Sequence, residues 1–293
     1  LFVAPWALGF LIFTVGPMIA SLFFSFTSYN VLTDAHWVGI KNYSDFVNYD
    51  QANMSKALLN TLYLAGIGVP LGLFSGLGVA LLLNQGVRGM RYYRTTFYLP
   101  AIVPGVASTV LWMWILNSDP NKGIINAFWN DTITQWFGVL PPGWLSVEAW
   151  SKPALIVMGL WGVGSGMILW LAGLKGVPQT LYEAASIDGA TPWQQFWSVT
   201  APQLSPIIFF NTVMGFIGAL QQFDNVYIIT KGEGAGPADS LLMPVYHLFQ
   251  NAFTYFKMGY ASALAWLIFA IVLVLTAIQF KLAPKWVHYE VEK

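Results

Sequence analysis

A stripe of amide side chains and glycines interrupts an otherwise apolar stretch in the last third of the chain. Asn211, Gly215, Gly218, Gln222 and Asn225 recur at intervals of three and four residues, the spacing that places side chains on one face of a helix. Amides donate and accept hydrogen bonds without carrying charge, which suits a neutral hydroxylated solute. Hydrogen bonding between packed helices would use the same residues. Both interpretations remain open at this point.

A carboxylate and several indole rings could also reach a solute. Asp224 is a charged residue in an apolar stretch, and its place beside the stripe favours a structural or gating role. Indole rings can stack on the faces of sugar rings, which makes Trp161 and Trp266 further candidates for solute contact. Anchoring at a membrane interface explains such rings equally well.

The polar segment 178–202 carries a second pattern, which is typical of two short capped helices. Pro178 suits a helix start, and Gly189 suits the left-handed backbone conformation that ends a helix. Thr191, Pro192 and Gln194 then have the spacing of a capping box, with Thr191 as the N-cap. Helices this short are unstable alone, so we expect the pair to lie on another surface.

The first of these two helices has the composition of a docking face. Leu181, Ala184, Ala185 and Asp188 share one side, and the small alanines permit close approach of another backbone. Glu183 adds a charge that a basic partner could meet. A connector that lies on the membrane surface is the alternative interpretation.

Several other chemistries are excluded or disfavoured. The sequence has no Cys, which excludes disulfides and thiolate metal sites, and its net charge of zero argues against nucleic acid. It contains no Gly-Lys dipeptide, so it has no Walker phosphate loop. Two glycine patterns indicate helix packing instead: the run 162–166, and Gly68, Gly72 and Gly76 at four-residue spacing.

The composition predicts the elements that hold these residues. Of 293 residues, 56% are hydrophobic and 9% charged, against about 25% charged in soluble domains. Apolar runs long enough to span a bilayer predict an all-α polytopic membrane protein, one domain over 1–293. The six predicted transmembrane helices are 3–27, 58–83, 97–117, 154–173, 203–227 and 259–281. The segment 240–256 is too polar to span and is predicted as a helix on the outer surface.

The distribution of charge predicts the orientation. Six spans put both termini on one side, together with the loop 84–96 and the segment 178–202. That side holds Arg88, Arg91 and Arg94, so the positive-inside rule predicts that both termini are cytoplasmic. The first residue is Leu1, from which we expect that a leader is missing. The outer loops 28–57 and 118–152 are large enough to receive a soluble binding protein.

The segment 178–202 resembles a known family motif. Glu183-Ala184-Ala185, with Gly189, Val199 and Pro202 further on, resembles the EAA loop of permease subunits of binding-protein-dependent ATP-binding-cassette (ABC) importers. The form is that of the carbohydrate-uptake and glycerophosphate branch, the maltose-type permeases. Further similarities are Asp188-Gly189-Ala190, Phe196, the stretch 222–230, the glycine-rich tract 232–237 and Lys285-Trp286-Val287, while Ala201 replaces the usual Leu.

The resemblance implies a function and a set of partners. Residues Glu183 to Gly189 would form a coupling helix, placed between the fourth and fifth spans, that docks on an ATPase subunit. The partners would be a second homologous permease, two ATP-binding subunits, an extracytoplasmic solute-binding protein, membrane lipid and a small-molecule carbohydrate such as a sugar, oligosaccharide or polyol. ATP and Mg would be held by the ATPase, so this chain would need no cofactor and would not be an enzyme. The location implied is a bacterial or archaeal cytoplasmic (inner) membrane.

Two alternatives come from other functional classes. A membrane-embedded enzyme acting on lipid-linked sugars would need clustered carboxylates or histidines at one membrane face, and the sequence shows no such cluster. A passive channel would carry solute without ATPase subunits.

Overall fold

The computed structural model describes residues 2–288, and these form a helical membrane protein, as predicted. Five continuous helices are long and apolar enough to cross a membrane: Ala4–Ser25, Lys41–Leu83, Glu148–Gly176, Pro192–Thr230 and Met258–Lys285. Met90–Ile102 and Gly105–Ile115 pass the same test together as one bent pair. The described part of the chain thus offers up to six crossings.

Several of the long helices contain π-helical or 3₁₀ turns, labelled η. The elements of the first half are α1 (Ala4–Phe10), η1 (Leu11–Val15), α2 (Gly16–Ser25), β1 (Thr27–Ser28), β2 (His36–Trp37), α3 (Lys41–Asp45), η2 (Phe46–Asp50), α4 (Gln51–Tyr63), η3 (Leu64–Gly68), α5 (Val69–Leu83), α6 (Met90–Ile102), α7 (Gly105–Ile115), α8 (Ile124–Trp129), η4 (Asn130–Thr134) and α9 (Gln135–Phe137). β1 and β2 pair antiparallel, with Thr27 opposite Trp37.

The second half begins with a long helix that carries a 3₁₀ turn at its centre. Its elements are α10 (Glu148–Trp161), η5 (Gly162–Gly166), α11 (Met167–Gly176), α12 (Gln179–Ile187), α13 (Pro192–Gln195), η6 (Phe196–Thr200), α14 (Ala201–Gln203), α15 (Ser205–Leu220), α16 (Asp224–Thr230), η7 (Pro237–Asp239), α17 (Pro244–Phe249), η8 (Gln250–Thr254), α18 (Met258–Leu282) and η9 (Ala283–Lys285).

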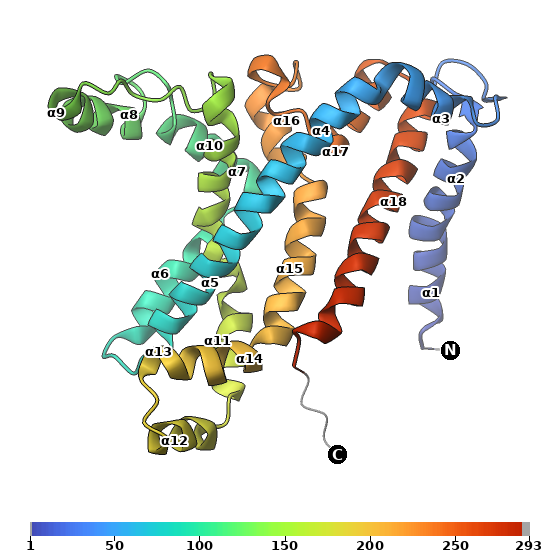
Figure 1. Cartoon of the computed structure of the whole chain (residues 1–293). Helices are drawn as coiled ribbons and strands as arrows, with labels where there is room; N and C mark the ends of the chain where they lie inside the picture. The colour runs from blue at the N-terminus through green and yellow to red at the C-terminus, as the bar shows by residue number, and fades with distance from the viewer. Residues whose placement is uncertain (1, 289–293) are drawn as a thin grey trace.

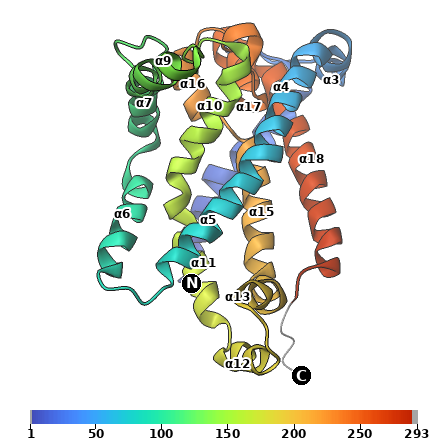
Figure 2. The same ribbon diagram turned by 60° about the vertical axis from the view of Figure 1, so that its left-hand side comes forward.

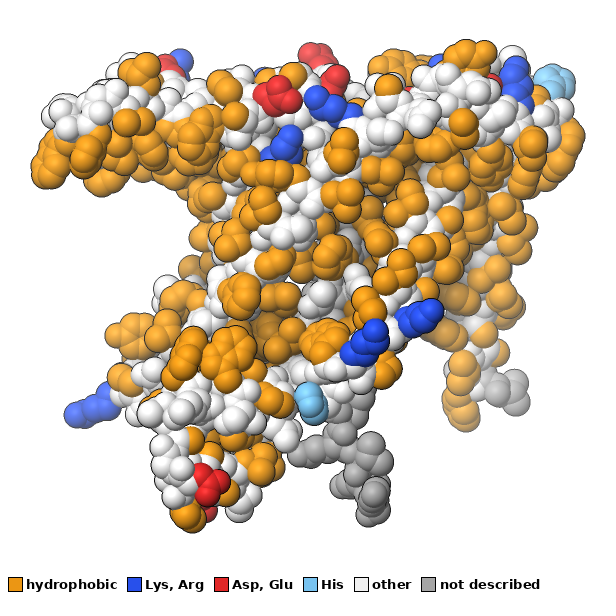
Figure 3. Space-filling model, viewed as in Figure 1, with side chains coloured by type: hydrophobic (Ala, Val, Ile, Leu, Met, Phe, Trp, Pro, Cys, Tyr) orange, Lys and Arg blue, Asp and Glu red, His pale blue; other side chains and the backbone are white. Residues whose placement is uncertain are grey.

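The long helices run between two ends of the molecule. α12 and α13 lie at one end, where α1 begins and α18 ends, and α3, α8, α9 and α17 lie at the other (Figures 1 and 2). Charged side chains gather at these two ends, while hydrophobic side chains cover the flank between them (Figure 3). This distribution is what a membrane-spanning bundle requires.

The predicted span 97–117 corresponds to the bent pair of helices α6 and α7. α6 and α7 meet at an angle of 98°, and α6 begins seven residues earlier than the predicted span, at Met90. Pro104 explains the break, because its ring disfavours helical backbone in the preceding residue. Val103 is accordingly extended, with φ of −70° and ψ of 126°.

The outer segments 28–57 and 118–152 are also more helical than predicted. The second helix begins at Lys41, so that it extends well before the predicted start of its span at residue 58. Met54 and Ala57 are buried in this extension, where α4 packs against α17, and this packing holds the polar turns helical. In the other segment, α8, η4 and α9 form a helical stretch over residues 124–137. The helix expected within 240–256 is present as α17 and η8, at the end opposite α12 (Figure 1).

The glycine run 162–166 forms the packing surface predicted for it. It adopts a 3₁₀ turn in the middle of the α10–α11 helix, and α6 lies against it. A Cβ atom added to Gly164 would overlap the backbone carbonyl of Phe97 in α6. Only a residue without a side chain permits this approach.

Candidate functional site

The segment 178–202 forms the two short helices predicted from its caps. α12 ends before Gly189, which has a φ of +77°, in the left-handed region. Thr191 caps α13 in a complete capping box with Gln194, whose amide oxygen accepts a hydrogen bond from the Thr191 backbone N–H at 2.8 Å. The left-handed glycine and the capping box are both confirmed.

Side-chain hydrogen bonds fasten α12 to the helices that follow it. The hydroxyls of Tyr182 and Thr200 are 2.8 Å apart, and Gln195 donates to the Ser186 hydroxyl at 3.0 Å and to the Ala190 carbonyl at 3.1 Å. The segment from α12 to α14, which we call the coupling hairpin, is therefore a rigid projection and not a loose connector.

The coupling hairpin exposes the residues predicted to dock. Glu183, Ala184, Asp188 and Gly189 are exposed, whereas Ala185 is half-buried. The sequence interpretation missed Ile187, which is 87% exposed on the same helix. A bare isoleucine beside a carboxylate at the tip of a rigid projection is suited to insertion into a cleft of another protein.

A cavity of about 420 Å³ lies within the bundle, between the long helices Lys41–Leu83, Glu148–Gly176 and Pro192–Thr230. Four of the predicted pathway residues line it: Asn211, Gly215, Gln222 and Asn225. The amide stripe thus faces a hollow, as expected for polar groups inside a membrane bundle. Apolar side chains such as Leu155, Ile156 and Leu160 complete the wall.

The other predicted pathway residues do not line this cavity. Gly218 and Asp224 are exposed on the helix, and Asp224 occupies the first turn of α16. Trp161 packs edge-on against Trp112, and Trp266 packs edge-on against Phe269. The indole that does line the cavity is that of Trp170.

Several glycines predicted only to pack also shape the cavity wall. Gly68, Gly72 and Gly76 line it, as do Gly162 and Gly166 at the 3₁₀ turn. A Cβ atom on Gly76 would lie 3.0 Å from the Trp170 indole nitrogen, whereas one on Gly72 would meet no atom within 4 Å. Gly76 therefore permits close packing, and Gly72 keeps space open.

The amide side chains that line the cavity differ in whether other groups of the protein hydrogen-bond to them. Asn211 donates to the Ile207 carbonyl of its own helix at 2.9 Å, and the Asn225 amide oxygen accepts from the Thr109 hydroxyl at 2.7 Å. The Gln222 side chain makes no hydrogen bond within residues 2–288, so both its donor and its acceptor are available to a solute.

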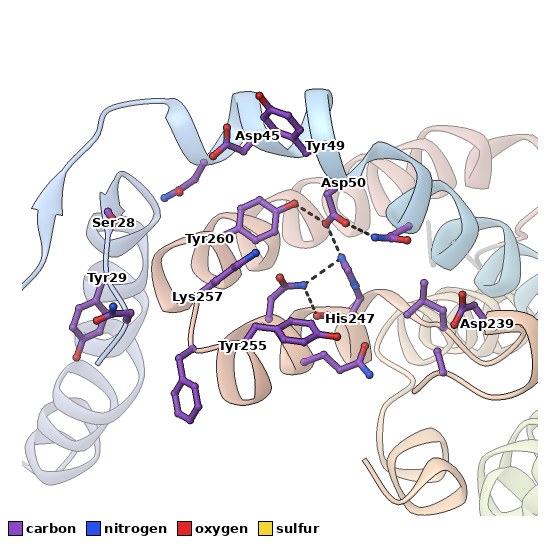
Figure 4. A pocket seen from close by; sticks show the side chains of 18 of the residues that line it. Ser28, Tyr29, Asp45, Tyr49, Asp50, Asp239, His247, Tyr255, Lys257 and Tyr260 are labelled. Atoms are coloured by element: carbon purple, nitrogen blue, oxygen red, sulfur yellow. Dashed lines mark hydrogen bonds and ion pairs between the residues drawn. The ribbon is translucent and has the colours of Figure 1, made fainter. Parts of the chain in front are cut away.

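A second cavity, of about 820 Å³, opens at the end opposite the coupling hairpin (Figure 4). The Asp50 carboxylate contacts three side chains of this cavity. One of its oxygens lies 2.6 Å from His247 Nε2 and accepts a hydrogen bond from the Tyr260 hydroxyl at 2.6 Å. The other oxygen accepts a hydrogen bond from the Asn53 amide at 2.9 Å. Asp50 and His247 are 197 residues apart, and no local pattern in the sequence could have paired them.

Asp50 precedes the segment 58–83 that is predicted to cross the membrane. Burial alone would raise the pKa of its carboxyl, but the hydrogen bonds from His247, Tyr260 and Asn53 outweigh burial and hold the pKa below its usual value of 3.8. The carboxylate is therefore charged at neutral pH and acts as a permanent acceptor.

Comparison with known proteins bears on these features. The family of inner membrane components of binding-protein-dependent transport systems matches residues 68–288. YesP of Bacillus subtilis, a probable ABC transporter permease protein, is 44% identical over 291 residues, which cover 99% of this chain and 91% of YesP. LacF of Rhizobium radiobacter, a lactose transport system permease protein, is 32% identical over 288 residues, 96% of this chain and 92% of LacF.

A solved structure shares the fold. It is that of a bacterial alginate ABC transporter in complex with an alginate pentasaccharide-bound periplasmic protein. One of its chains superposes with a TM-score of 0.78 over 97% of this chain and 93% of its own length, at 23% identity. At this level of identity the likeness speaks for the fold alone.

Proposed function

We propose that this chain is a permease subunit of an ATP-driven carbohydrate importer. The chain belongs to the family of inner membrane components of binding-protein-dependent transport systems. Identity of 44% to a probable ABC transporter permease, spread over 99% of the chain, supports this assignment. The chain forms half of the translocation pathway, and a second homologous permease forms the other half.

The coupling hairpin is the observation that carries the proposal. Its exposed segment from Glu183 to Gly189 docks on an ATPase subunit, one of two that bind ATP and Mg in place of this chain. Closure of the ATPase dimer pushes on α12, and the rigid hairpin passes this motion to the long helices through Tyr182 and Thr200. The bundle then alternates between inward- and outward-facing states.

The solute is a sugar, an oligosaccharide or a polyol that passes through the cavity lined by Asn211, Gln222 and Asn225. Uncharged amides beside glycines offer hydrogen bonds to hydroxyl groups without favouring an ion. LacF, a lactose transport system permease protein that is 32% identical to this chain, carries a name that agrees with a carbohydrate.

The coupling hairpin and both termini face the cytoplasm, and the end with α8, α9 and α17 faces outward, where an extracytoplasmic solute-binding protein docks. The three arginines of the 84–96 loop lie on the hairpin side, in agreement with the positive-inside rule. The membrane is the cytoplasmic membrane of a bacterium or archaeon.

Charge reversal at Glu183 tests the coupling. We expect Glu183→Lys to lower ATP-driven sugar uptake into membrane vesicles by about tenfold or more and to release the ATPase during co-purification, because a misplaced charge at a docking face costs more than 1.4 kcal/mol. Gly189→Val should have the same effect, since a branched residue is strained at a φ of +77°.

Asp131→Lys is the matched control, because Asp131 is an exposed carboxylate at the opposite end of the molecule. The ATPase should co-purify with this variant as it does with the unchanged chain. Full uptake by both Glu183→Lys and Gly189→Val would refute the coupling role of the hairpin, and sugar flux without any ATPase subunit would favour a passive channel.

A further inference from the structure

The outer cavity around Asp50 lies apart from the proposed pathway. It is lined by residues of β1, η2, α17, η8 and α18, and it shares no lining residue with the cavity of the amide stripe. Nothing in the transport mechanism described above requires it. Its chemistry can therefore be considered separately.

The protein itself occupies the amide nitrogens of three residues that line this cavity, whereas the Lys257 ammonium makes no hydrogen bond within residues 2–288. The amide nitrogen of Asn42 donates to the carbonyls of Ser25 and Thr27, at 2.8 and 2.9 Å. The amide nitrogens of Gln250 and Asn251 donate to the carbonyls of Gly234 and His247, both at 3.0 Å. His247 and Tyr260 are held by Asp50.

The acceptors, in contrast, remain free. Within residues 2–288, no donor reaches the amide oxygens of Asn42, Gln250 and Asn251 or the carboxylate of Asp45. The three amide side chains are more than nine-tenths buried, yet their oxygens keep contact with the open space of the cavity. Amide and carboxylate oxygens that face open space can accept hydrogen bonds from a ligand. Such a lining selects a ligand that brings several hydrogen-bond donors.

Aromatic rings stand at the mouth of the same cavity. Tyr49 is 82% exposed on one wall. On the other wall, Tyr255 is 57% exposed and Phe256 is 50% exposed. Flat apolar surface beside hydrogen-bonding groups matches a pyranose ring, which has an apolar face and a rim of hydroxyls.

The lining carries three carboxylates, Asp45, Asp50 and Asp239, and one lysine, Lys257 (Figure 4). Asp50 is paired with His247. Among the described residues no group of three or more histidines and carboxylates could hold a metal ion. The free acceptors together with the aromatic rings at the mouth favour the hydroxyls of a neutral ring, and an ammonium ion is the alternative that the experiment below includes.

We propose that this outer cavity is a second carbohydrate site, which binds a neutral polyhydroxylated ring at the extracytoplasmic surface before it enters the pathway. Its volume of about 820 Å³ lies within the range of small-molecule sites. The sugar class and the outward orientation of this site rest on the proposed function. The presence of the cavity and its lining does not depend on that function.

A cysteine scan suits the test, because the chain has no native Cys. Ser28 is small, exposed and part of the lining, so Ser28→Cys reports occupancy of the cavity through its rate of reaction with a membrane-impermeant maleimide. The complete transporter is placed in nanodiscs of phosphatidylethanolamine and phosphatidylglycerol, which carry no sugar. The probes are the methyl glycosides of glucose, galactose, mannose, xylose and rhamnose.

We expect at least one glycoside, at about 50 mM, to slow labelling about sixfold, the protection that a Kd of about 10 mM gives by mass action. Asp45→Ala in the same background should remove most of this protection, and Asp34→Ala, which changes charge on a nearby exposed loop outside the lining, should leave it intact. Ammonium chloride should give no protection.

Three outcomes would overturn the site: no glycoside protects, ammonium protects as well as a glycoside, or Asp45→Ala keeps full protection. ATP-driven uptake by the transporter that carries only Ser28→Cys is measured in parallel. Normal uptake without protection refutes the outer site alone, whereas protection without any ATP-driven uptake refutes the proposed function and leaves the site standing.

Discussion

Asp50 joins three helices that are far apart in the sequence. Its carboxylate closes the first part of the second long helix onto α17 through His247 and onto α18 through Tyr260. His247 is 6% exposed, so its ring depends on this partner for its hydrogen bond. The Asp50 side chain thus links three helices at the outer end of the bundle.

We expect Asp50→Ala to destabilise the protein, because it leaves His247 and Tyr260 without their acceptor. The cost is about 1–3 kcal/mol, which corresponds to a fall in melting temperature of several degrees. Thermal unfolding in detergent measures it. Asp131→Ala removes an exposed carboxylate that makes no side-chain hydrogen bond in the described chain, and it should leave the melting temperature unchanged. Equal melting temperatures for both variants would contradict the role of Asp50.

The contribution of Asp50 should also depend on pH in a definite direction. Hydrogen bonding holds its pKa in the folded protein below the usual 3.8, so the folded state binds the proton less readily than the unfolded state does. The stabilisation is therefore full well above pH 3.8 and is lost as pH falls below it. The difference in melting temperature between the unchanged chain and Asp50→Asn should stay constant from about pH 7 to 5 and shrink below pH 3.8. A difference that grows on acidification would contradict this sign.

Gly72 tests whether the inner cavity is the pathway. Because a Cβ atom there would meet no atom within 4 Å, Gly72→Leu should fold normally while its side chain fills the cavity. Uptake of the solute should fall about tenfold or more, since each 1.4 kcal/mol of barrier is a factor of ten. Gly66→Leu has equal space but points away from the cavity, and its uptake should be unchanged. Normal uptake by Gly72→Leu would place the pathway elsewhere.

Helix ends that depend on neighbouring residues could be predicted from the sequence. The capping box at Thr191 and the left-handed turn at Gly189 depend on residues three or fewer positions away, and both were predicted correctly. The start of the second helix at Lys41 was not, because its first turns are polar and are held by contact of α3 with α18 and of α4 with α17. The amide stripe was predictable from its period, whereas the pairing of Asp50 with His247 across 197 residues was not.

The contact between α6 and the 3₁₀ turn at 162–166 makes a sharp prediction. Gly164→Ala should force α6 away, because the atom in its path is a backbone carbonyl that cannot rotate aside. Overpacking of this kind costs about 1–3 kcal/mol. Gly159→Ala, in the same helix, meets nothing within 4 Å and is the control. Thermal unfolding compares the two, and a Gly164→Ala variant as stable as Gly159→Ala would show that α6 does not pack here.

At the scale of the whole molecule, three features lie in sequence along the long helices. The outer cavity occupies one end, the amide-lined cavity lies within the bundle, and the coupling hairpin projects from the other end (Figure 1). In the proposed mechanism, a solute and an ATPase act on opposite ends of the same long helices. Import by this arrangement requires that the coupling hairpin lie on the cytoplasmic side of the membrane.

Single cysteines in this Cys-free chain test that orientation in intact cells. We expect Asp131→Cys, beside α8, to react with a membrane-impermeant maleimide from outside, because its side chain is exposed at the outer end. Gln85→Cys is equally exposed, in the turn between α5 and α6 at the hairpin end, and should react only after the membrane is permeabilised. Labelling in the reverse order would invert the topology, place the hairpin away from any cytoplasmic ATPase, and refute the proposed coupling and outer sugar site together.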